Sequence, residues 1–271
     1  METAFHAVEA QGRWITIALL LVLLSWESLA PFFDFFRAKW KERSVHLVRN
    51  LIMGIINSTM IALVFIAAWL WAADLALAKR IGLLYLVELP SWAHALGAVL
   101  LFDFWTYWWH RFNHVVPLFW RFHRVHHSDL HMDVTTANRF HFGEIFFSSV
   151  FRVPLILLFG AQLWHIALYE LIMFPIVQFH HANIGLPDRI DRLFRILFVT
   201  PAMHKVHHSR LRTETDSNYT SLFSIWDRLF GSFRLRDDLH EIDFGLDGYD
   251  ESGKQNVSGL IKTPFENVRN G

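Results

Sequence analysis

The sequence predicts an all-α protein, a multi-span transmembrane helical bundle with a cytosolic histidine-rich helical cap. Of the 271 residues, 53% are hydrophobic and only 18% are charged, whereas about 25% are charged in a typical soluble domain. Several apolar stretches approach the ~20 residues that a membrane-spanning helix needs. The chain has 17 histidines and no cysteine. This composition suits metal binding through imidazole and excludes disulfides, zinc–thiolate sites and iron–sulfur clusters.

The apolar stretches give the expected order of elements. The predicted spans are residues 14–33, 50–78 and 91–109, followed by a hairpin of two short helices at 145–178. Gly160 should break this hairpin, because glycine often marks a turn between helices. We expect residues 1–236 to form a single membrane-embedded domain. Residues 237–271 are rich in Asp, Gly, Ser and Asn, which predicts a flexible polar tail.

The distribution of positive charge sets the expected orientation. The loop after the first span carries Arg37, Lys39, Lys41, Arg43 and Arg49. Positively charged loops favour the cytoplasmic side of a membrane, and the alternation of spans then brings the histidines to that side. We therefore expect an integral membrane protein, in a bacterial inner membrane in preference to the endoplasmic reticulum. Lys+Arg and Asp+Glu are equal at 25 each, so we expect no nucleic-acid partner.

Histidines occur in four groups. The groups read HRFNH at 110–114, HRVHH at 123–127, HH at 180–181 and HKVHH at 204–208. Residues three and four apart share a helix face, so each longer group can direct its imidazoles to one point. Pro117 should end the helix that carries the first group, and Pro201 should begin the helix that carries the last.

The number of histidines indicates two metals rather than one. A tetrahedral zinc takes four ligands, whereas eight or nine histidines suit two ions. Imidazole binds zinc, copper, iron and nickel, and the spacing alone leaves the metal open. Asp103 and Glu170 could accept the free N–H of a liganding histidine, and a buried polar contact that locks the bundle is an equal alternative for both. Glu144 lies one turn after His141 and could form a similar pair with it or be a ligand itself.

With these motifs the sequence resembles the sterol desaturase and fatty acid hydroxylase superfamily, whose members are integral-membrane, non-haem di-iron oxygenases. The superfamily pattern is HX3H, HX2HH and a later HX2HH, which here reads HRFNH, HRVHH and HKVHH. Further matches are FDFWTYWWHR, TTANRFHFGE, HHAN and NYTSLFSIWDRLFGSF. The resemblance runs from about residue 103 to residue 233, and the combination of motifs is highly specific.

The resemblance implies nine metal ligands. They are His110, His114, His123, His126, His127, His181, His204, His207 and His208. His180 could share the role of His181, and Asn183, two residues after His181, is a further candidate ligand or supporting residue. A proline often follows the histidine of HFGE in the family and is absent here, so the roles of His141 and Glu144 stay open. The other histidines match no motif and are interpreted as ordinary, His46, His131 and His240 among them.

The resemblance implies an O2-dependent di-iron lipid hydroxylase or desaturase that acts on a C–H bond of a membrane lipid. A sterol, a fatty acyl chain and an ether lipid are all compatible with the sequence. Expected cofactors are two iron ions, which zinc can replace in purified protein, together with O2. No flavin motif, nucleotide-binding loop or haem domain is evident. Electrons should therefore come from a separate cytochrome b5-like protein, ferredoxin or reductase. The alternatives are a membrane zinc hydrolase of a lipid ester or amide, and a non-enzymatic metal store or transporter.

Overall fold

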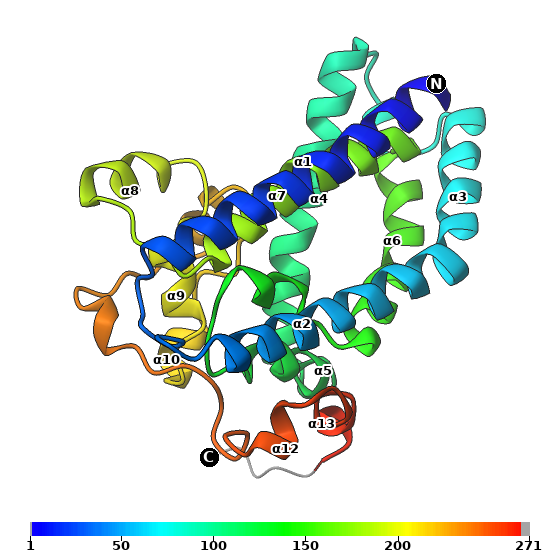
Figure 1. Ribbon diagram of the computed structural model, residues 1–271. Helices are drawn as coiled ribbons and strands as arrows, with labels where there is room; N and C mark the ends of the chain where they lie inside the picture. The colour runs from blue at the N-terminus through cyan, green and yellow to red at the C-terminus, as the bar shows by residue number, and fades with distance from the viewer. Residues whose placement is uncertain (1, 267–271) are drawn as a thin grey trace.

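The computed structural model describes residues 2–266, and all its regular elements are helices (Figure 1). The α-helices are α1 (Glu2–Leu29), α2 (Trp40–Met60), α3 (Ile66–Lys79), α4 (Ser91–Val115), α5 (Pro117–His127), α6 (Phe142–Phe159), α7 (Leu163–His181), α8 (Asp188–Phe194), α9 (Pro201–His207), α10 (Arg212–Thr215), α11 (Ile225–Leu229), α12 (Ser252–Gln255) and α13 (Val257–Lys262). The described residues contain no β-strand beyond two isolated bridges. The predicted all-α class is confirmed.

The long helices pack against one another in pairs. Figure 1 shows α1 lying along α7, and these two helices are in extensive contact. Helix α4 packs on both α5 and α7, and α3 packs on α6. A π-helical turn (Ile61–Phe65) joins α2 to α3, and the chain changes direction there (Figure 1). Such a turn inserts an extra residue into the helical ladder, which is a recognised cause of a kink.

Two helical stretches in the described residues are long and apolar enough to cross a membrane. They are Trp40–Tyr85 and Phe142–Phe159, whereas Trp14–Leu29 is a shorter apolar helix. The first span was expected to reach residue 33, but α1 ends at Leu29 because Pro31 cannot continue a helix. Helix α4 contains the third expected span and continues to Val115, so it also carries the first histidine motif, as expected. The full set of spans and their orientation stay predictions.

The predicted helix breaks are confirmed. Gly160 ends α6 with φ 75°, and a Cβ at this position would lie 2.8 Å from the Ile81 carbonyl oxygen. Glycine is required there for both its backbone conformation and the close approach. Helix α4 ends at Val115 and α5 begins at Pro117. Helix α9 begins at Pro201, where the fixed φ of proline suits the first helical position.

The polar C-terminal segment is packed onto the rest of the chain as far as Glu266. Leu260 is fully buried and contacts Met53 and Val125. Gln255 donates to the Ser128 carbonyl oxygen at 2.8 Å. The sequence predicted a flexible tail here because the segment is mainly polar. A few apolar side chains such as Leu260 nevertheless pack into the fold. The last part of that predicted tail, residues 267–271, lies outside the described residues.

Candidate metal centre

Nine buried or half-buried histidines form two adjacent clusters. The five-histidine cluster contains His110, His114, His123, His127 and His207. The four-histidine cluster contains His126, His181, His204 and His208. Within each cluster one nitrogen of every histidine lies within 4.8 Å of the corresponding nitrogen of every other member. All nine residues were expected from the sequence to lie at one site. The division into five and four was not expected.

The ring nitrogens of the five-histidine cluster face one another at short range. The Nε2 atom of His110 lies 3.1 Å from that of His123 and 3.0 Å from that of His207. The Nε2 atoms of His123 and His127 are 3.2 Å apart. These residues come from α4, α5 and α9, so the cluster joins three helices that are distant in sequence.

The four-histidine cluster has the same geometry. The Nε2 atom of His181 lies 3.1 Å from that of His126 and 3.0 Å from that of His204. The Nε2 atoms of His204 and His208 are 3.2 Å apart. His126 and its neighbour His127 therefore belong to different clusters, because adjacent residues on a helix point about 100° apart.

Backbone carbonyl groups fix the tautomer of several of these rings. His110 Nδ1 donates to the Tyr219 oxygen (2.6 Å), His207 Nδ1 to the Ser217 oxygen (2.6 Å) and His181 Nδ1 to the Val177 oxygen (2.7 Å). With Nδ1 protonated, Nε2 carries a lone pair and cannot donate. Two such lone pairs about 3 Å apart repel each other unless a cation lies between them. The separation suits a metal bound at about 2.0–2.1 Å, so the donor set fits the metals that the sequence implied.

Two carboxylates extend this support. His123 Nδ1 lies 3.0 Å from Glu144 Oε1, and the same oxygen accepts a hydrogen bond from Asn113 at 3.1 Å. His114 Nδ1 lies 3.3 Å from Asp216 Oδ1. Glu144 thus contacts His123, whereas the sequence suggested His141 as its partner. Asp216 was not expected. The position of Asp216 eight residues after the last histidine motif was the available signal in the sequence.

Burial favours the neutral form of several of these imidazoles. It lowers the pKa of His207 to about 3, against the opposing effect of the hydrogen bond to the Ser217 carbonyl. Burial, together with neighbouring histidines, also holds the pKa values of His126, His127 and His204 well below the usual value of 6.5. Only a neutral imidazole has a free lone pair for a metal. These four imidazoles are therefore in the form that can bind a metal at neutral pH.

Two carboxylates expected beside the histidines lie elsewhere. Asp103 accepts hydrogen bonds from Trp226 Nε1 at 2.7 Å and from the Phe223 backbone N–H at 3.2 Å, which joins α4 to the chain around α11. Glu170 forms an ion pair with Arg152 at 2.6 Å. Neither carboxylate contacts a histidine, because each lies two or more turns along its helix from the clusters. The alternative expectation, a polar contact that locks the bundle, describes Asp103.

The remaining candidate residues surround the clusters. His141 caps α6 by accepting from the Gly143 backbone N–H at 2.9 Å. Asn183 is hydrogen-bonded to both backbone groups of Phe33, at 2.9 and 2.8 Å, and so pins the chain after α1. His180 lies beside the four-histidine cluster, with its ring centroid 3.9 Å from that of His204. It is not one of the nine histidines whose nitrogens converge.

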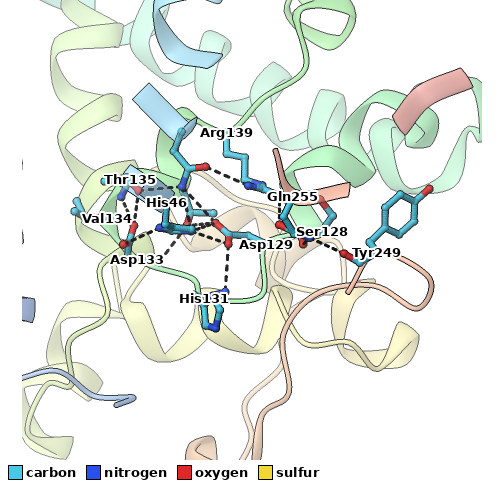
Figure 2. A network of polar contacts seen from close by, with 12 residues as sticks. His46, Ser128, Asp129, His131, Asp133, Val134, Thr135, Arg139, Tyr249 and Gln255 are labelled. Atoms are coloured by element: carbon cyan, nitrogen blue, oxygen red, sulfur yellow. Dashed lines mark hydrogen bonds and ion pairs between the residues drawn. The ribbon is translucent and has the colours of Figure 1, made fainter. Parts of the chain in front are cut away.

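A buried polar network follows the second motif, and Figure 2 shows His46 and the backbone of His131 directed at Asp129. His46 Nε2 lies 2.8 Å from Asp129 Oδ1, and His46 Nδ1 lies 3.2 Å from Asp133 Oδ2 (Figure 2). Arg139 is fully buried and donates to Ser128 Oγ at 3.2 Å. From the sequence, His46 was expected to be an ordinary histidine. The two carboxylates that soon follow HRVHHS, Asp129 and Asp133, were the available signal.

The two similar hexapeptides, HRVHHS and HKVHHS, differ at one position, and both cations there are buried. Arg124 donates to the backbone oxygens of Thr263 and Glu266. Lys205 donates to the backbone oxygens of Ala182 and Ile184, at 3.2 and 2.9 Å. Each cation thus fastens its histidine helix to a different neighbouring segment.

A largely apolar cavity of about 510 Å³ extends from the histidines. His110, His123 and His126 line it, together with Trp105 and Trp109. A cavity of this size falls in the range of small-molecule sites. The histidine clusters are therefore accessible to an apolar molecule.

The fold and the site define a helical, histidine-rich metalloprotein with an apolar cavity. The model of the fatty acid hydroxylase family matches residues 95–232, which include all nine clustered histidines. The chain belongs to this family, within the sterol desaturase and fatty acid hydroxylase superfamily that the motifs indicated.

Curated relatives agree with this assignment. The chain is 34% identical to an alkylglycerol monooxygenase of Danio rerio over 165 residues, which is 60% of this chain and 35% of the relative. The human alkylglycerol monooxygenase is 32% identical over 55% of this chain and 32% of its own length. The ornithine lipid hydroxylase OlsE of Rhizobium tropici is 32% identical over 58% of this chain and 48% of its own length. The matches thus span a third to a half of these relatives. No solved structure matches the chain.

Proposed function

We propose that this protein is an O2-dependent di-iron hydroxylase of a membrane lipid. The observation that carries the proposal is the pair of histidine clusters beside an apolar cavity. The named relatives that hydroxylate or oxygenate lipids support it. Desaturation, in which a second hydrogen is lost from the neighbouring carbon, is the other outcome that the sequence left open, and the relatives' names favour hydroxylation.

The five-histidine and the four-histidine cluster would each hold one iron ion. Bound iron would supply the activation of O2 and the oxidation of the C–H bond. The chain's own part is to present neutral imidazoles, with Nδ1 of His110 and His207 held by backbone oxygens. Glu144 orients His123 in the same way. Such outer contacts are worth about 10–100-fold in metal affinity or activity.

The cavity would position the lipid and exclude water. Its apolar wall, with Trp105 and Trp109 near His110, favours an alkyl chain beside the histidines. We propose that electrons come from a separate carrier protein, a cytochrome b5-like protein, a ferredoxin or a reductase. We further propose an integral membrane protein with the histidine clusters on the cytoplasmic side of a bacterial inner membrane.

The test uses purified protein loaded with iron, a chemical or enzymatic electron source, a membrane lipid extract and 18O2. Mass spectrometry should find a lipid product that carries one oxygen-18 atom, with matching O2 uptake. His207→Ala should give no product, whereas His240→Ala, which changes an exposed histidine, should behave as wild type. Oxygen-independent turnover of a lipid ester by zinc-loaded protein would instead support a zinc hydrolase. A product that has lost two hydrogens and carries no label would indicate desaturation.

A further inference from the structure

An ion pair within the predicted membrane hairpin lines the cavity. Arg152 on α6 donates from Nη1 to Glu170 Oε1 on α7 at 2.6 Å. The guanidinium group also lies 4.8 Å from the centroid of the Trp69 ring. All three residues line the cavity that reaches the histidines. Charged side chains in membrane-spanning segments are costly and usually functional, and neither charge belongs to the metal centre.

The ion pair lies at a defined depth from the histidines. Glu144, which contacts His123, precedes Arg152 by eight residues on α6. At 1.5 Å per residue, this is about 12 Å along the helix axis. On α7, Glu170 precedes His181 by eleven residues, which is about 16 Å. Between these two levels α7 contributes the apolar side chains of Met173, Phe174 and Val177 to the cavity, and His180 beside the histidine clusters.

The chemistry of the pair limits what can bind to it. The Arg152 and Glu170 side chains are 19% and 38% exposed, so a molecule in the cavity can reach both. A carboxylate or an ammonium group would pair with one partner and leave the other charge unpaired in an apolar setting, which is costly. A hydroxyl group can accept from the guanidinium and donate to the carboxylate at the same time. It therefore leaves every group satisfied.

We propose that Arg152 and Glu170 form a recognition subsite for the hydroxyl group of an otherwise apolar lipid, whose chain extends from there to the histidines. The inference rests on the proposed function and names its substrate class. A hydroxyl held at the pair places carbons about 12 Å further along the chain beside the metal centre. The pair thus selects hydroxyl-bearing lipids over hydrocarbons and fixes which carbon is presented.

Binding of tritiated 1-hexadecanol to the metal-free protein in detergent, measured by scintillation proximity, tests the subsite without any turnover. The competitors are hexadecane, which lacks the hydroxyl, and 1-methoxyhexadecane, which cannot donate a hydrogen bond. Arg152→Met/Glu170→Met removes both charges together, so that neither is left unpaired. The matched control is Lys254→Met/Glu266→Met. It removes an ion pair of comparable exposure, 27% and 28%, from the C-terminal segment.

The wild-type protein and the control should bind the alcohol at least about tenfold more tightly than the alkane, as expected for hydrogen bonds to charged groups. The methyl ether should fall between the two. The double methionine variant should lose this preference while it still binds the alkane. Partition into micelles is the same for every protein, so it cancels from the comparison. A preference that the double variant retains would overturn the subsite and leave the pair a purely structural contact.

If the double variant does not fold, Glu170→Gln decides the question. Its neutral amide keeps hydrogen bonding but loses the charge, and charge-assisted hydrogen bonds are about twice as strong as neutral ones. The alcohol preference should therefore fall severalfold, and an unchanged preference would refute the proposal. The proposed function fails separately, if iron-loaded wild-type protein forms no oxygenated lipid from 18O2 whatever the binding result.

Discussion

The adjacent residues His126 and His127 belong to clusters of different size, so their replacement should affect metal binding differently. His126 is one of four histidines in its cluster, whereas His127 is one of five. Both side chains are buried, at 1% exposure each, so replacing either with alanine leaves a comparable void. His126→Ala leaves three imidazoles in the smaller cluster. His127→Ala leaves four in the larger cluster, as many as the intact smaller cluster has.

The expected magnitude follows from ligand count. Binding a structural metal with four protein ligands is worth about 10–16 kcal/mol, or roughly 3 kcal/mol per ligand. The loss of one ligand from four should weaken metal binding by about 100-fold, since about 1.4 kcal/mol corresponds to a factor of ten. His126→Ala should therefore hold one iron per chain where wild type holds two. His127→Ala should keep close to two.

The assay loads each protein with iron, passes it through a column that contains a chelator, and measures iron per chain by plasma mass spectrometry. The chelator concentration is the highest at which the wild-type protein retains two ions. Equal loss of iron from the two variants would refute the division into five and four. Retention of two ions by His126→Ala would refute the assignment of His126 as a ligand.

Three further predictions concern activity, acid and the C-terminal segment. His207→Ala should reduce turnover at least about 100-fold in a protein that still elutes as wild type, and near-normal turnover would exclude a site shared between the two hexapeptides. The metal-free protein should lose stability as the pH falls below about 6.5. An unfolded histidine takes up a proton there, whereas the pKa of folded His207 is about 3. Equal urea midpoints at pH 7.5 and pH 5 would contradict this. Leu260→Ala should destabilise the protein by about 2–5 kcal/mol, because the side chain is fully buried. Urea unfolding in mild detergent measures this change. A change below about 0.5 kcal/mol would mean that the C-terminal segment adds little to the stability of the fold.

Much of the site depends on the geometry of single helices and could therefore be predicted from the sequence. Helical spacing of three and four residues groups the imidazoles, and this requires only the geometry of a single helix. Pro117 and Pro201 set helix ends because proline lacks a backbone N–H. Gly160 ends α6 because only glycine readily adopts its backbone conformation and allows so close a neighbour.

Contacts with backbone oxygens were beyond the sequence. His110 and His207 are held by the carbonyl groups of Tyr219 and Ser217. Every residue has a backbone carbonyl, so no residue type in the sequence indicates which carbonyl will accept the hydrogen bond. The packing of the C-terminal segment was missed for a related reason, since a few apolar anchors such as Leu260 outweigh its polar composition once they are buried.

By itself the sequence determined the helical class, the family and the nine histidines, because each of these depends on residue type and on spacing within one segment. The tertiary structure alone decided how the nine histidines divide, since His126 and His127 face different helices only after α7 and α9 have packed. It also paired Glu170 with Arg152 across the α6–α7 hairpin rather than with a histidine. The distance between side chains on different helices is set by packing, and sequence spacing does not contain it.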